Sequence, residues 1–384
     1  MTRNRSFLGV IIGLPYLHGL WHPQSKASAN TQAQRFNVLY QILYTLSFYP
    51  MYSTLRNLVA IDSPTGFTHQ ACQYIFDLLK SYGWQPEFTN KGAVRCTLGN
   101  QAPTLSIAAH VDTLGAIVSK VKSDGTLGIS KLGSPLLTSY ETEYCRIYTL
   151  DGKIYTGTLL LNNPSAHANR EAETTKRDLS NMHIRIDEET YTKEQTEDLG
   201  IQIGDIIAFD TRYQELPSGY IKSRFMDNKA GCYVLFEIAR RLAQQNQTAP
   251  VELFFSNYEE VGHGGTCGYA PTIQELLTID MGVLGNDNEG TETHCSICVK
   301  DGSGPYDYHF RRRLVHLAQH HQIPFKQDVY VYYSSDGSAA LSAGQPFRVA
   351  LIGPGVAASH GMERTHQKGI QATINLCLAY INAM

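Results

Sequence analysis

The sequence predicts an α/β fold, in which a three-layer, mostly parallel sheet carries helices on both faces and is interrupted by an inserted small β-barrel domain. Two nearly continuous apolar runs, residues 104–109 and 251–255, are typical of strands buried on both faces of a parallel sheet. Segments of helical periodicity alternate with such runs before and after residues 118–219. In that middle region, short alternating runs lie between Gly, Asp and Asn turns, which favours a small barrel. This order indicates one discontinuous α/β domain and not two consecutive domains.

The predicted elements follow the same division. Residues 1–35 are an N-terminal extension, residues 36–117 and 220–384 form the α/β domain, and residues 118–219 form the inserted barrel. Helical spacing of apolar residues predicts helices at 36–52, 53–62, 70–82, 230–244, 272–277, 307–321, 337–343 and 369–384. Strands are predicted at 93–98, 104–109, 128–132, 146–149, 153–161, 206–209, 251–255, 281–284, 328–333 and 347–352, and the polar stretch 162–202 is expected to be rich in loops.

The composition excludes several classes of protein. Of 384 residues, 42% are hydrophobic and 17% are charged, which is typical of a globular protein and not of a collagen, a coiled coil or a disordered chain. The net charge is −3, and no basic run is longer than Arg311–Arg313. We therefore expect no nucleic-acid partner and no membrane partner.

The cysteines and the N-terminal segment indicate the cellular compartment of the protein. Eight cysteines are scattered, and the single close pair, Cys295 and Cys298, is a weak signal for zinc or redox chemistry without a second such pair. Reduced, buried cysteines are typical of a reducing compartment, so the expected location is cytoplasmic. Residues 2–5 are basic, residues 7–14 are apolar and residues 27–29 resemble a cleavage site. Export through a signal peptide in residues 1–29 is the alternative.

Five clusters of acidic residues and histidines follow predicted buried strands or open glycine-rich turns, the places where ligands of open α/β sheets gather. The clusters contain His110 and Asp112, Asp227, Glu259 and Glu260, Asp280, and His360 and His366. Each has an ordinary structural explanation when it is considered alone, such as a helix cap or a solvated turn. Together they provide two histidines and three or four carboxylates, which suits two zinc-class ions about 3.5–4 Å apart with a hydroxide between them, and leaves one carboxylate as a general base.

The adjacent acids Glu259 and Glu260 are the most informative of these. Side by side at the end of a buried strand, two carboxylates repel each other, and burial makes the repulsion worse. A positive charge is therefore expected nearby. The neighbouring glycines 262, 264 and 265 permit a close approach of the backbone to that charge.

The order of these motifs resembles the M42 family of cocatalytic metallo-aminopeptidases, the glutamyl aminopeptidase group, which is related to the M20 and M28 di-zinc peptidases. The resemblance covers residues 51–384, so residues 1–50 have no counterpart and Met51 is a possible start of translation. The matching motifs are His110–Gly115, Asp227–Gly231, Glu259–Gly262, Asp280, Ser335–Gly337 and Arg364–His366.

The resemblance implies a role for each site residue and two divalent metal ions per subunit, zinc first and cobalt as the alternative. It implies that His110 and Glu260 bind the first ion, that Asp280 and His366 bind the second, that Asp227 bridges both, that Asp112 orients His110, and that Glu259 is the general base. His360 stays open as the alternative to His366, and Asp336 is expected to support the site.

The implied function is a metal-dependent aminopeptidase that removes N-terminal residues from peptides through a hydroxide activated by two metals. An M20-like amidohydrolase acting on N-acylated small molecules is the alternative within enzymes, and a peptide-binding assembly protein is the alternative outside them. The inserted barrel resembles the family's dimerisation domain, which implies a homo-oligomer and, at the largest, a dodecamer. Asn228 and Lys229 depart from the family's usual Asp-Arg, so the preferred N-terminal residue of the substrate stays open.

Overall fold

The computed structural model describes residues 52–384. The predicted N-terminal extension, and all but the last residue of the helix predicted at 36–52, lie outside the described residues. Within residues 52–384, none of the helices combines the length and the hydropathy that a membrane span requires.

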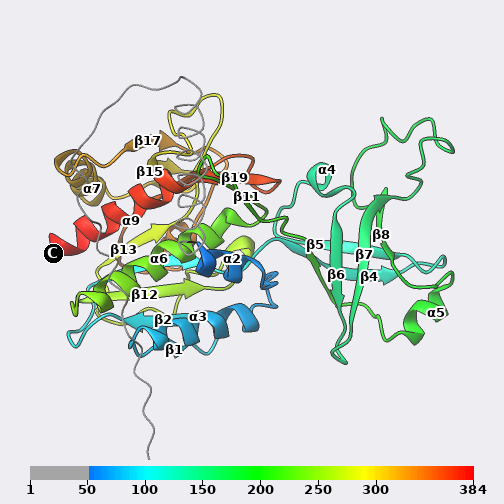
Figure 1. Ribbon diagram of the computed structural model, residues 1–384, viewed down its shortest axis with the longest axis horizontal. Coiled ribbons are helices and arrows are strands. Elements are labelled where there is room, and N and C mark those ends of the chain that lie inside the picture. Colours follow the sequence, from blue (N-terminus) through cyan, green and yellow to red (C-terminus); the bar gives the residue numbers. More distant parts are fainter. Residues whose placement is uncertain (1–51) are drawn as a thin grey trace, which may run out of the picture. The chain divides into compact units, whose positions relative to one another are not determined.

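A mostly parallel sheet of ten strands forms the centre of the α/β part (Figure 1). In spatial order its strands are β1 (Glu87–Phe88), β2 (Val94–Thr97), β12 (Val251–Ser256), β3 (Leu105–His110), β13 (Glu275–Ile279), β18 (Arg348–Val356), β15 (Cys295–Asp301) and β16 (Gly304–Pro305), with β14 (Gly282–Val283) beside β18 and β17 (Phe325–Val329) beside β15. The four central strands β12, β3, β13 and β18 are parallel. Every residue of β3 and β12 is buried, as the continuous apolar runs predict.

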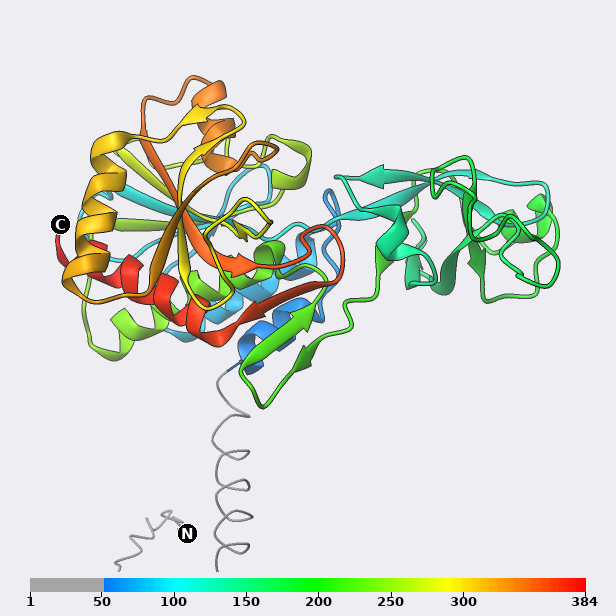
Figure 2. The same ribbon diagram turned by 90° about the horizontal axis from the view of Figure 1, so that it is seen from above.

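Helices cover both faces of the sheet, and this confirms the predicted fold class. They are α2 (Ser53–Val59), α3 (His69–Ser81), α6 (Met226–Gln244), α7 (Tyr308–His320), α8 (Asp336–Ser342) and α9 (Gln367–Asn382). Ile107 and Phe255 belong to the core on one face, which also contains residues of α2, α3, α6, α7 and α9. Ala108 and Phe254 point the other way, into a smaller core with Ala340 of α8. Figures 1 and 2 both show α6 and α9 lying side by side across the first face.

The insertion is a closed six-stranded barrel with its own core. Its strands, in order around the barrel, are β4 (Gly115–Val121), β5 (Leu127–Leu132), β8 (Met182–Ile186), β7 (Ile154–Leu161), β6 (Tyr144–Tyr148) and β9 (Ile206–Phe209), and two short helices accompany them, α4 (Leu137–Tyr140) and α5 (Lys193–Asp198). A separate three-stranded sheet joins β10 (Gln214–Glu215), β11 (Tyr220–Ser223) and β19 (Glu363–His366). The domain limits at residues 118 and 219 stay a prediction.

Three sequence predictions about local structure were wrong. The helix predicted at 272–277 is instead the strand β13, which lies between two parallel neighbours. The prediction failed because a short apolar run is compatible with a helix turn as well as with a buried strand. The strand predicted at 281–284 is reduced to the two residues of β14. The strand predicted at 328–333 lies earlier in the chain, as β17, and β15 was not predicted. The stretch 162–202 is rich in loops, as expected, apart from β8 and α5.

One acid lies inside the sheet, away from the candidate site. Glu252 on β12 has only 1% of its surface exposed. The hydroxyl of Ser106 donates to its Oε1 and the amide of Ala270 donates to its Oε2, both at 3.0 Å. Burial raises the pKa of Glu252 to about 7. Because the raised pKa means that the folded state favours the neutral acid, ionisation of Glu252 destabilises the fold as the pH rises.

We predict that Glu252→Gln removes this pH dependence. The glutamine amide resembles the neutral acid, so the variant should match the wild type in stability near pH 4 and exceed it above about pH 7, by about 3 kcal/mol from the linkage between pKa and stability. Urea unfolding of both proteins across this range measures the difference. The exposed Glu188→Gln serves as the matched control, and a difference that stays constant with pH would refute the prediction.

Candidate metal centre

The candidate site lies where three parallel strands end. Strand β3 ends at His110, which is level with Ser256 at the end of β12. Strand β13 ends one residue before Asp280. Because neighbouring parallel strands bring their carboxyl ends to one edge, side chains from distant parts of the sequence meet there. The turn Glu259–Val261, which follows β12, and Asp227 in the first turn of α6 complete the group.

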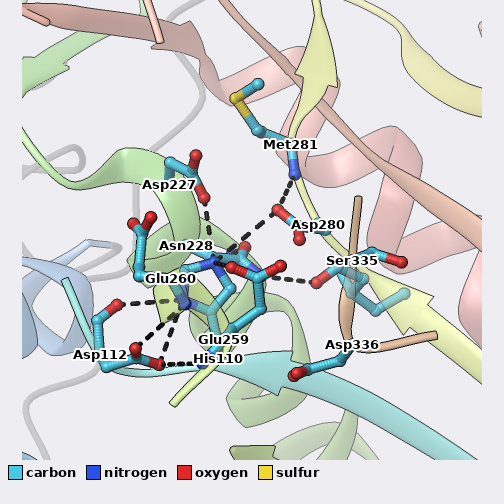
Figure 3. A network of polar contacts seen from close by, with 12 residues as sticks. His110, Asp112, Asp227, Asn228, Glu259, Glu260, Asp280, Met281, Ser335 and Asp336 are labelled. Carbon is cyan, nitrogen blue, oxygen red and sulfur yellow. Dashed lines mark hydrogen bonds and ion pairs between the residues drawn. The ribbon is translucent and has the colours of Figure 1, made fainter. Parts of the chain in front are cut away.

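The centre of the site is a histidine surrounded by acids. The Nε2 atom of His110 lies 3.0 Å from Oδ1 of Asp227, 3.8 Å from Oε2 of Glu259 and 4.0 Å from Oδ1 of Asp280. His110, Asp227 and Glu260 each offer a ligand atom, and these three atoms lie within 4.8 Å of one another. Figure 3 shows the five side chains turned toward one another. This is a possible metal-binding triad with two further acids beside it.

Asp112 fixes the orientation of the His110 ring through contacts with its Nδ1 atom. The Nδ1 atom of His110 lies 3.0 Å from the carbonyl oxygen of Asp112 and 3.6 Å from its carboxylate, so Nδ1 donates to Asp112 and Nε2 is directed at the other acids. The carboxylate of Asp112 accepts hydrogen bonds from the Thr65 hydroxyl at 2.7 Å and from the amides of Glu259 and Glu260 at 3.1 and 3.3 Å. It therefore fixes both the imidazole and the acidic turn.

The electrostatics of the cluster favour a bound cation. Burial raises the pKa values of Glu259 and Glu260 well above their ordinary range, and neighbouring acids raise them further. Burial, followed by the charge of Asp227, raises the pKa of Asp280 to about 8. Burial disfavours the charged form of His110, but the surrounding acids raise its pKa well above the ordinary value. Burial likewise opposes the charge of Asp227, but His110 and His360 lower its pKa. Oε1 of Glu260 is buried without a hydrogen-bond partner. This donor set fits divalent metal ions, whose charge would offset the repulsion.

His360, and not His366, lies beside this cluster. Its Nε2 atom is 3.5 Å from Oδ2 of Asp227 and 3.7 Å from Oε2 of Glu260. Its Nδ1 atom is 3.1 Å from the carbonyl oxygen of Ser134, which leaves Nε2 directed at the acids. Despite burial, Asp227 raises the pKa of His360 to about 9.

The structure does not bring His366 to the site. It ends β19, which pairs with β11, and its ring packs edge-on against Tyr220. Its Nδ1 accepts the amide of Lys368 as the N-cap of α9, and its Nε2 lies 3.1 Å from the carbonyl of Ser218.

Other supporting residues surround the group. Asp336 at the start of α8 is buried, and the hydroxyl of Ser256 donates to its Oδ2, while its supporting role stays a prediction. Thr65, Ser256 and Glu363 were not singled out by the sequence. Of these, Glu363 lies three residues after His360, so the sequence shows that the two are close. It does not show the hydrogen bond between Glu363 and the distant amide of Asp227.

A cavity of about 480 Å³ opens onto the acids. It is lined by Ser134, Leu136, Asp227, Glu259, Glu260, Gly262, Asp280, Met281, Val283, Tyr332, Tyr333, Ser334, Ser359 and His360. Among these residues there is no lysine or arginine, and His360 is the one basic side chain. A ligand in this cavity therefore meets four carboxylates together with apolar and hydroxyl-bearing side chains.

The fold and the site define an α/β protein with a candidate metal centre at the carboxyl edge of its sheet, and comparison with known proteins narrows this class. The chain belongs to the M42 peptidase family, described as M42 glutamyl aminopeptidase, whose sequence profile matches residues 92–376. The chain is 41% identical over 333 residues to the putative aminopeptidase YhfE of Bacillus subtilis, which covers 86% of this chain and 96% of that relative. The predicted family is thereby confirmed.

Two TET peptidases are among the solved structures that resemble the fold. The TET aminopeptidase from the marine sediment archaeon Thaumarchaeota archaeon SCGC AB-539-E09 aligns with a TM-score of 0.76 at 19% identity, over 85% of this chain and 95% of that chain. The Pyrococcus horikoshii TET1 peptidase, which can assemble into a tetrahedron or a large octahedral shell, also aligns with a TM-score of 0.76 at 19% identity. This alignment covers 86% of this chain and 99% of that chain. At this identity the likeness concerns the fold alone.

The positions of the two histidines give a direct prediction. His360→Ala should lose about one equivalent of bound metal per chain, because its Nε2 faces the shared acids. His366→Ala should keep its metal and lose only stability, by about 1 kcal/mol, because it removes a helix cap. Metal analysis of both purified variants, with thermal melts, separates the two roles. The reverse pattern would show that His366 is the ligand.

Proposed function

We propose that this chain is a metal-dependent aminopeptidase that hydrolyses N-terminal residues from peptides. The observation that carries the proposal is the convergence of ligand atoms of His110, Asp227 and Glu260 within 4.8 Å of one another, beside a cavity that Asp227, Glu259 and Glu260 line. Membership of the M42 family and the name of the Bacillus subtilis relative support the same activity.

We further propose that the site holds two divalent ions, zinc first and cobalt as the alternative, with Asp227 between them. Oδ1 of Asp227 faces His110 at 3.0 Å, and its Oδ2 faces His360 at 3.5 Å, an arrangement that suits a bridging carboxylate. The distances favour a pairing different from the one that the resemblance implies. Asp280 lies 4.0 Å from His110 and Glu260 lies 3.7 Å from His360, so we pair His110 with Asp280 and His360 with Glu260.

Ions held there would polarise the scissile carbonyl and make a neighbouring water more acidic. The chain itself supplies the proton transfer. Glu259 lies beside the cluster, with its Oε2 3.8 Å from Nε2 of His110, and it lines the cavity. Its raised pKa suits a carboxylate that accepts a proton from water and then donates it to the leaving amine. Asp112 orients the imidazole and holds the turn that carries Glu259.

We predict that Glu259→Gln abolishes turnover and keeps the metal. The amide has nearly the same shape but accepts no proton, so kcat should fall by about 10²–10⁴-fold or more. Measuring kcat and the metal content of the same preparation tests the assignment. If the metal is lost together with the activity, Glu259 is a ligand and the general base must be sought elsewhere.

The cavity lining also indicates the kind of first residue that the enzyme accepts. No lysine or arginine lines the cavity, so an acidic first side chain would find no strong cationic partner. The lining acids are those assigned to the metal centre, which leaves none for a basic side chain. Leu136, Met281 and Val283 offer apolar surface instead. An uncharged, apolar first residue is therefore favoured.

We predict that leucyl- and methionyl-anilides are cleaved faster than glutamyl- and lysyl-anilides, by about tenfold or more in kcat/KM, since burying an unpaired charge costs more than burying a methylene group. Comparing the four substrates measures this preference. N-acetyl-leucine is included in the same series, because cleavage of the N-acyl compound alone would support the amidohydrolase and reject the aminopeptidase.

We also propose that the chain forms a homo-oligomer, at the largest a dodecamer. The Pyrococcus horikoshii peptidase, whose fold this chain shares, is the precedent for assembly. Within the barrel, several large apolar side chains are exposed, which is typical of a surface that contacts another protein. These are Tyr144, Leu150, Ile154, Tyr191 and Ile203.

A further inference from the structure

We propose that Glu363 is a positioning residue that sets the spacing of the metal centre by holding the main chains of two candidate ligands at once. This inference rests on the proposed function, because it assumes that Asp227 and His360 bind metal. It assigns to Glu363 no contact with the metal or the substrate.

The carboxylate of Glu363 is shared between two segments that are distant in the sequence. Its Oε2 accepts the amide of Asp227, 136 residues away, at 3.0 Å. Its Oε1 accepts the amide of His360, three residues away, also at 3.0 Å. Glu363 has only 2% of its surface exposed, so water does not compete for these hydrogen bonds. One rigid, planar group thus joins the start of α6 to the loop that follows β18.

The two hydrogen bonds of Glu363 restrain the backbone of Asp227 and His360, and the backbone determines where their side chains lie. His360 adopts a φ of 59°, in the left-handed region that residues with a Cβ seldom occupy. Such a conformation costs free energy and persists where its surroundings fix it. The hydrogen bond from its amide to Glu363 is one such restraint. With the backbone fixed, the contact of Nδ1 with Ser134 orients the ring toward Asp227.

The loop that carries His360 is also held by a second side chain, Arg224. Nη1 of Arg224 donates to the carbonyl of Gly361 at 3.0 Å, and the same guanidinium forms a buried ion pair with Glu143 at 2.7 Å. Removing the hydrogen bonds of Glu363 should therefore loosen the spacing between the two ligands and leave the loop folded. The expected consequence is weaker metal binding.

Glutamine distinguishes a positioning role from a mere need for a polar side chain. A carboxylate has two acceptor oxygens, whereas the glutamine side chain has one acceptor and one NH2 group. In Glu363→Gln that NH2 group would face either the amide of Asp227 or that of His360, donor against donor. One of the two hydrogen bonds is lost while size and burial stay the same.

The experiment measures the Zn²⁺ dissociation constant of the full-length chain by competition with a chelator, together with circular dichroism and a thermal melt of the metal-free protein. We expect Glu363→Gln to bind Zn²⁺ about 10–100-fold more weakly, as is usual when a partner of a metal ligand is lost. Excess Zn²⁺ should restore most of kcat, with KM little changed. The control Glu292→Gln breaks the ion pair with Arg364, next to Glu363 in the chain, and should keep the wild-type affinity.

Two outcomes separate this inference from the proposed function. If Glu363→Gln is folded and binds Zn²⁺ as tightly as the wild type, Glu363 has no positioning role. If the wild type binds no Zn²⁺, or if His110→Ala binds it as tightly as the wild type, the metal centre itself is refuted. Should Glu363→Gln fail to fold, Glu363→Asp, which keeps the charge but is too short to reach both amides, takes its place and must also weaken Zn²⁺ binding.

Discussion

Repulsion between buried carboxylates is the constraint on which this site depends. Parallel strands deliver Asp280 and the turn after β12 to one edge, and α6 adds Asp227. Burial raises the free energy of every negative charge gathered there, and the nearby acids increase it again. Two imidazoles lie among these acids, but they offset only part of the charge. Divalent cations would resolve the conflict, so the cost of assembling the acids and the affinity for metal are two aspects of one arrangement.

The surrounding groups keep that arrangement in place without binding anything themselves. Asp112 restrains the acidic turn through two backbone amides, and Glu363 restrains the two ligand segments in the same way. In both cases a carboxylate accepts hydrogen bonds from backbone amides, so the side chains of the candidate ligands are not used for these contacts. A site built this way needs little reorganisation on binding, because the spacing of its donors is set before the ion arrives.

Much of this was predictable from the sequence, since the acids that matter follow continuous apolar runs. His110 and the Glu259–Glu260 pair come after strands whose burial the sequence made plain. Asp280 lies between the helix predicted at 272–277 and the strand predicted at 281–284, whereas in the structure it follows the buried strand β13. A short apolar run does not distinguish a buried strand from a helix turn. The sequence did not separate His360 from His366. Which of two histidines six positions apart faces the acids depends on the pairing of β19 with β11, a long-range contact that local periodicity does not encode.

The contact between Ser134 and His360 connects the inserted barrel to the candidate metal centre. Ser134 lies between β5 and α4, in the stretch of chain that passes through the barrel, yet its carbonyl holds the imidazole whose other nitrogen faces the acids. A minimal enzyme made by excising the barrel and joining its ends with a short linker would lose this acceptor and leave the ring free to rotate. The insertion thus supplies an acceptor to the candidate metal centre, and a displacement of the loop around Ser134 would change the orientation of the His360 ring toward Asp227.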